Sequence, residues 1–131
     1  MMKILLVEDS LLLQDRLRRV ISAIPNAVLV AETDNEDDAR FCLEEHRPDV
    51  AVIDLQLKSG SGLSVIEHVK AACLETTVIV LTNLAQPEYR AKCVELGAHH
   101  FFDKSKDIGA FTHLLADLSK IRVEPVGVRS A

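Results

Sequence analysis

Short apolar runs alternate with amphipathic stretches along this chain, and polar residues bound each run. The runs are four or five residues long and most are rich in Val and Ile, which is typical of strands buried on both faces. They are Ile4–Val7, Val28–Ala31, Val50–Ile53, Val78–Leu81 and Ala98–Phe102. The pattern therefore predicts five buried strands.

The stretches after these runs carry apolar residues three and four positions apart, which is the spacing of an amphipathic helix. Helical periods occur within residues 13–24, 39–46, 65–73, 89–96 and 108–118. Ser10 stands where it can cap the first helix. Pro87 and Gly97 stand where the fourth helix is expected to begin and end.

Alternation of strands and helices with short links implies parallel strands joined by right-handed crossovers. The fold class is therefore α/β, a doubly wound five-stranded parallel sheet with helices on both faces. The runs Ile4–Val7, Val50–Ile53 and Val78–Leu81 contain no polar residue and are expected to be central. Ala98–Phe102 contains two histidines and is expected at an edge. The domain is expected over residues 1–121, followed by a loose tail over 122–131.

Composition narrows the class of protein. A chain of 131 residues suits one domain, and an apolar share of 48 % supplies a core. The net charge of −5 disfavours nucleic-acid binding by this chain. No run approaches the roughly 18 apolar residues of a membrane span. The three cysteines form no Cys-x-x-Cys pair, which predicts buried free thiols in a reducing compartment such as the cytoplasm.

Polar residues follow the strands at the point where parallel sheets bind ligands. They are Glu8 and Asp9 after the first run, Asp54 after the third, Thr82 after the fourth, and Asp103 and Lys104 after the fifth. Singly, each has an ordinary explanation, such as a helix cap, an Asx turn or an exposed ion pair. Their occurrence at four strand ends favours a shared site.

Crowded carboxylates are stable as anions when a hard cation offsets their charge, and Mg²⁺ binds carboxylates, carbonyls and phosphoryl oxygens. The Lys104 ammonium and the Thr82 hydroxyl can bind further phosphoryl oxygens. Asp54 is the natural acceptor, because a carboxylate can form an acyl phosphate. In the unphosphorylated protein we expect Lys104 to lie against Asp54 and the Thr82 hydroxyl to rotate freely.

The segments VEDS, VIDLQLKSGSG, VIVLT and GAHHFFDKS, in this order, resemble the response-regulator receiver domains of two-component signalling, the CheY-like superfamily. The resemblance covers Met2 to about Ile121. It implies a flavodoxin-like sheet of order 2-1-3-4-5. It also implies site residues: Asp54 as phosphoacceptor, Asp9, Glu8, Asp54 and the Gln56 carbonyl as Mg²⁺ site, Thr82 and Lys104 as phosphoryl contacts, and Thr82 with Phe101 as switch.

The resemblance further implies a phosphorylation-dependent switch that accepts a phosphoryl group from a histidine kinase or a histidine phosphotransfer protein. It implies an output surface over Gln86 to Lys120, a homodimer on phosphorylation, and no enzymatic activity beyond the domain's own phosphorylation and dephosphorylation. The chain is then either a stand-alone receiver or the receiver segment of a longer regulator.

Three positions depart from the family's pattern. Lys58 stands where Pro often follows the phosphoacceptor loop, and Asn83 stands where a small residue is usual. Ser105 replaces the Pro that usually follows the Lys, where the family's bond is typically cis. A cis bond before Ser costs about 2.5–4 kcal/mol, so this loop is expected to differ in conformation.

Other function classes remain as alternatives. A haloacid-dehalogenase-like hydrolase also uses an Asp nucleophile and Mg²⁺, but its Asp-x-Asp motif is missing, since Gln56 follows Asp54-Leu55. A flavodoxin-like FMN carrier needs a phosphate loop after the first strand, where Glu8 and Asp9 would repel phosphate. A pseudo-receiver that binds proteins without phosphorylation is the third, and the presence of Asp54, Thr82 and Lys104 together argues against it.

Overall fold

The computed structural model describes residues 1–72 and 74–121. The expected tail over residues 122–131 and the third cysteine, Cys73, lie outside these residues. The strands are β1 (Met2–Val7), β2 (Ala27–Thr33), β3 (Val50–Ile53), β4 (Thr77–Thr82) and β5 (His100–Asp103). The helices are α1 (Leu11–Ser22), α2 (Glu36–His46), α3 (Gly62–Ala71), α4 (Pro87–Leu96) and α5 (Ile108–Ile121).

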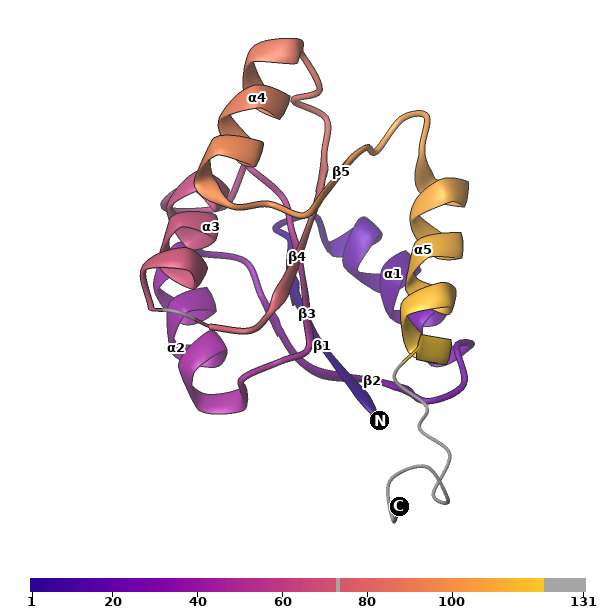
Figure 1. Cartoon of the computed structure of the whole chain (residues 1–131). Helices are drawn as coiled ribbons and strands as arrows, with labels where there is room; N and C mark the ends of the chain where they lie inside the picture. Colours follow the sequence, from indigo (N-terminus) through magenta and orange to yellow (C-terminus); the bar gives the residue numbers. More distant parts are fainter. Residues whose placement is uncertain (73, 122–131) are drawn as a thin grey trace.

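The strands form one parallel sheet of order β2-β1-β3-β4-β5. Helices α1 and α5 cover one face, and α2, α3 and α4 cover the other (Figure 1). The predicted doubly wound α/β fold, its strand order and its helices on both faces are confirmed.

The central strands are apolar on both faces because each face packs against helices. On the α1 and α5 side, Ile4 and Leu6 belong to a buried cluster with Phe111. On the other side, Leu5 and Val7 belong to a second cluster around α2, α3 and α4. Consecutive residues of β1 thus enter opposite cores, which explains the unbroken apolar run.

The two edge strands differ from the prediction. Strand β2 is not buried on both faces, since Val28 is 38 % exposed. Strand β5 begins at His100 and not at Ala98. The Ala98 N–H donates to the Cys93 carbonyl (2.9 Å) and thereby helps to close α4, so Ala98 serves the helix cap.

The predicted helix ends are confirmed. The Ser10 hydroxyl accepts a hydrogen bond from the Leu13 N–H (3.2 Å), Pro87 begins α4, and Gly97 ends it with φ +110°. Cys93 is buried as expected, whereas Cys42 is only half-buried. No peptide bond among the described residues is cis, so Lys104 and Ser105 are joined by a trans bond.

Candidate functional site

The site lies where the carboxyl ends of neighbouring parallel strands meet. Backbone hydrogen bonds place three of its segments next to one another. The Glu8 N–H donates to the Thr33 carbonyl, the Asp54 N–H donates to the Val7 carbonyl, and the Lys104 N–H donates to the Thr82 carbonyl, at 2.9–3.0 Å. The sheet itself therefore fixes the positions from which these side chains extend.

Lys104 joins two of the carboxylates. Its Nζ lies 2.7 Å from Asp54 Oδ2 and 2.8 Å from Glu8 Oε1. The expected contact between Lys104 and Asp54 is confirmed. The contact with Glu8 was not foreseen, because the sequence does not show that one ammonium reaches both strand ends.

Glu8, Asp9 and Asp54 each offer a carboxylate oxygen, and these oxygens lie within 4.8 Å of one another. Glu8 and Asp54 are only 2 % and 3 % exposed, whereas Asp9 is exposed. Three carboxylates face one ammonium, so the cluster carries excess negative charge when all are ionised. The donor set therefore fits a hard cation such as Mg²⁺.

Burial and charge oppose each other here. Burial raises the pKa of Glu8, and its hydrogen bonds from Lys104 and from the Ser10 N–H only partly offset this. Burial lowers the pKa of Lys104, but the hydrogen bonds to Asp54 and Glu8 outweigh it, so the pKa is raised overall. Lys104 is thus held as a cation.

The loop that follows Asp54 turns back onto it. Asp54 Oδ1 accepts a hydrogen bond from the Gln56 N–H at 3.2 Å, which is an Asx turn. Each Asp54 oxygen thus has a hydrogen-bond donor, one from Lys104 and one from Gln56. The Asx turn and the site function, weighed as alternatives from the sequence, occur together.

Thr82 is fully buried at the end of β4, beside the strand that carries Asp54. Its Oγ1 accepts a hydrogen bond from the Leu84 N–H at 3.2 Å. The expectation that this hydroxyl rotates freely is therefore wrong, because the turn after β4 supplies a donor. Any inward movement of Thr82 must break this hydrogen bond.

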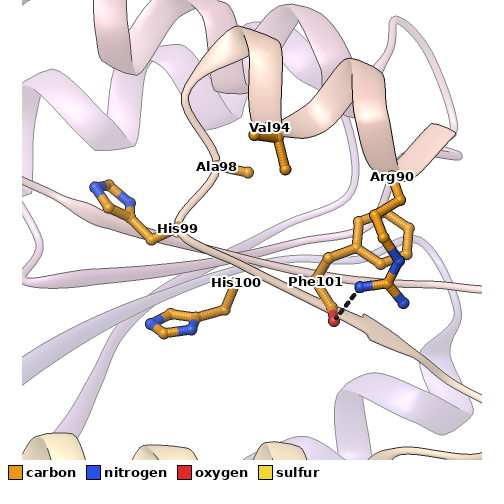
Figure 2. A pocket seen from close by; sticks show the side chains of 6 residues that line it. All are labelled: Arg90, Val94, Ala98, His99, His100 and Phe101. Atoms are coloured by element: carbon orange, nitrogen blue, oxygen red, sulfur yellow. Dashed lines mark hydrogen bonds between the residues drawn. The ribbon is translucent and has the colours of Figure 1, made fainter. Parts of the chain in front are cut away.

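Two other sequence-predicted residues lie apart from the carboxylates. Asp103 Oδ1 accepts hydrogen bonds from the Ser105 N–H (2.8 Å) and hydroxyl (2.7 Å), which lower its pKa. Phe101 is half-buried on β5, and the Arg90 guanidinium lies 4.5 Å from its ring centroid (Figure 2). In Figure 2, His99 and His100 extend to opposite sides of the strand, as alternation predicts.

Two residues near the site were missed from the sequence. Glu36 was taken as an acid that favours a helix N-terminus, yet its side chain also bonds the loop after Asp54. Gly62 packs directly against the Asp54 backbone, where an added Cβ would lie 2.1 Å from the carbonyl oxygen. The signal that could have found them is the glycine spacing in SGSG, which indicates close backbone approach.

The family described as the response regulator receiver domain matches residues 4–116. The chain is a receiver domain of that family. The acid tolerance regulatory protein ActR of Rhizobium meliloti (strain 1021) is 35 % identical over 122 residues, which cover 93 % of this chain and 62 % of that protein. The virulence transcriptional regulatory protein PhoP of Salmonella typhimurium (strain 14028s / SGSC 2262) is 33 % identical over 79 % of this chain and 46 % of that protein.

Solved structures agree on the fold of this receiver domain. A LuxR-family DNA-binding response regulator from Staphylococcus aureus matches with a TM-score of 0.83 at 24 % identity, covering 91 % of this chain and 99 % of that one. The response regulator domain of Thermotoga maritima CheB matches with a TM-score of 0.80 at 20 % identity, covering 95 % and 98 %.

The receiver domain spans only part of its curated relatives, from 26 % of a Treponema pallidum methylesterase/glutaminase to 62 % of ActR. In the described part of the chain, every helix is too short or too polar to cross a membrane. Membership of this family displaces the hydrolase and FMN-carrier alternatives, which rested on shared topology.

Proposed function

We propose that Asp54 is the phosphoacceptor of a phosphorelay switch and that Lys104 and Thr82 bind the transferred phosphoryl group. The observation that carries this proposal is the position of Lys104 Nζ, which lies 2.7 Å from Asp54 Oδ2 inside a cluster of carboxylates. A phosphoryl group on Asp54 would enter beside this ammonium, which then binds one of its oxygens.

The proposed donor is a phosphohistidine of a histidine kinase or a histidine phosphotransfer protein. A P–O bond forms to an Asp54 carboxylate oxygen as the P–N bond to the donor imidazole breaks. The imidazole nitrogen keeps the electron pair of that bond and, with one proton from solvent, leaves as neutral imidazole. The products are an acyl phosphate on Asp54 and the free donor histidine.

Receiver domains bind Mg²⁺ at an acidic cluster, and the proposed ligands here are Asp9 and Asp54, with the Gln56 carbonyl and Glu8 through water. When bound, the cation would neutralise charge on the phosphoryl oxygens. Within the chain, Lys104 holds Glu8 and Asp54 together, and the Gln56 N–H fixes the second oxygen of Asp54.

Phosphoramidate carries a P–N bond like that of the proposed donor and tests the acceptor. In the presence of Mg²⁺ we expect the intact protein to gain the mass of one phosphoryl group, and Asp54→Asn to gain none. Asp37→Asn, which neutralises an exposed acid of α2, is the matched control and should gain mass like the wild type. A mass gain that persists in Asp54→Asn, or one insensitive to a chelator, would remove Asp54 from this role.

The two acids after β1 should differ in their contribution to cation binding. We expect Asp9→Ala to weaken Mg²⁺ binding by about 100-fold and Glu8→Ala by about tenfold, because solvent can partly replace a water-mediated ligand. Calorimetric titration with Mg²⁺ measures both, with Asp37→Asn as control. Equal losses, or the reverse order, would contradict the proposed ligand roles.

The proposed output surface spans Gln86 to Lys120 and includes Phe101 as the switch aromatic. The Arg90 guanidinium stacks on Phe101 there, so this ring begins in a defined contact. A downstream protein target, or a second copy on phosphorylation, would bind this surface. The proposed setting is the cytoplasm, where free thiols such as Cys42 and Cys93 are common.

The receiver is proposed to act on its own phosphorylation and dephosphorylation, with any other activity in a partner or in another segment of a longer regulator. The second candidate, a pseudo-receiver without phosphorylation, is favoured by the Lys104–Glu8 contact, since an ion pair can be purely structural. The phosphoramidate experiment separates the two.

A further inference from the structure

A side chain from α2 holds the loop that follows Asp54. Glu36 is the first residue of α2, and its Oε1 accepts a hydrogen bond from the Ser61 N–H at 3.1 Å. Its Oε2 lies 3.4 Å from an Arg40 guanidinium nitrogen, which orients the carboxylate. The Glu36 side chain is 19 % exposed, so the bond to Ser61 is partly shielded from solvent.

Backbone contacts clamp the same two segments together. The Lys58 N–H donates to the Asp34 carbonyl (2.9 Å), and the Glu36 N–H donates to the Ser59 carbonyl (3.0 Å). Residue 60 is glycine with φ +78°, and an added Cβ would lie only 2.4 Å from Glu36 Cβ. The approach is therefore so close that Glu36 lies directly against the loop backbone.

The clamp connects to the proposed cation site in one further step. Ser61 forms an antiparallel bridge with Gln56, and the Gly62 N–H donates to the Leu55 carbonyl at 3.1 Å. Gln56 is the residue whose carbonyl is the proposed ligand and whose N–H bonds Asp54. Glu36 thus bears on Gln56 through Ser61.

We propose that Glu36 is a positioning residue, which holds the loop from Leu55 to Ser61 so that the Gln56 carbonyl and Asp54 are arranged for cation binding and phosphoryl transfer. This inference rests on the proposed function of Asp54. Glu36 acts by accepting a hydrogen bond, and its charge is secondary. Glutamine keeps an acceptor oxygen at the same distance from the backbone, whereas alanine removes it.

The test compares Mg²⁺ affinity, by calorimetry, in the wild type, Glu36→Ala, Glu36→Gln and Asp37→Asn. We expect a loss of about fivefold in Glu36→Ala and changes within about twofold in the other two variants. At saturating Mg²⁺, phosphorylation of Glu36→Ala by phosphoramidate should recover. Amide hydrogen exchange at Ser61 should be faster in Glu36→Ala and near the wild-type rate in Glu36→Gln, which reports the clamp without any phosphorylation.

Equal Mg²⁺ affinity in Glu36→Ala and the wild type would overturn the inference and leave the proposed function intact. Equal losses in Glu36→Gln and Glu36→Ala would also overturn it, since charge and not the hydrogen bond would then be responsible. Failure of the wild type to bind Mg²⁺ and take up phosphate would overturn the proposed function together with this inference. Urea unfolding of each variant ensures that affinities are compared among folded proteins.

Discussion

Lys104→Ala should lower the free energy of unfolding by about 3–5 kcal/mol when no divalent cation is present. The substitution leaves Glu8 and Asp54, each almost fully buried, without the ammonium that bridges them at 2.8 and 2.7 Å. Two buried carboxylates next to each other repel, and neither gains a new partner. Urea unfolding in the presence of a chelator measures the loss.

Saturating Mg²⁺ should return part of this stability, because a cation that binds the folded state raises its free energy of unfolding. The gain from Mg²⁺ should be larger in Lys104→Ala than in the wild type, since the variant has the larger uncompensated charge. Lys106→Ala is the matched control, because Lys106 lies two residues further on and is exposed, and it should change stability by no more than about 0.5 kcal/mol. Equal stability of Lys104→Ala and the wild type under chelation would show that the ion pairs add nothing to the fold.

Periodicity predicted the central strands well because their burial is symmetrical. Strand β3 has the predicted bounds, Val50–Ile53, since helices cover both faces and every residue is buried. Strand β2 was predicted too short, because edge residues such as Val28 contact solvent and their side chains carry a weaker signal. Composition of a single run does not reveal whether its neighbours lie on one side or on two.

Residues at strand ends could be predicted as a group, since the topology brings carboxyl ends of parallel strands together. Glu8, Asp54 and Lys104 do meet. What could not be predicted is how each polar atom is satisfied. The Thr82 hydroxyl bonds the Leu84 N–H, and Asp103 bonds Ser105, because short turns offer donors that depend on backbone angles absent from the residue pattern.

Gly62→Ala should lower the free energy of unfolding by about 3 kcal/mol, as expected for overpacking against atoms that cannot move aside. The added Cβ would lie 2.1 Å from the Asp54 carbonyl oxygen and 2.7 Å from Leu55 Cα. Both are backbone atoms of the segment that carries the proposed phosphoacceptor. Relief of the overlap must therefore displace either the start of α3 or the Asp54 backbone, and phosphorylation by phosphoramidate should slow as well.

Gly109→Ala makes the same change in the first turn of α5, where an added Cβ meets no atom within 4 Å. There the substitution should raise the free energy of unfolding by about 0.5–1 kcal/mol, because alanine loses less backbone entropy than glycine in a helix. The two variants are thus expected to change stability with opposite signs, which urea unfolding measures directly. If Gly62→Ala were as stable as Gly109→Ala, the close approach of α3 to Asp54 would not constrain the loop, and residue 62 would contribute only helix propensity to the site.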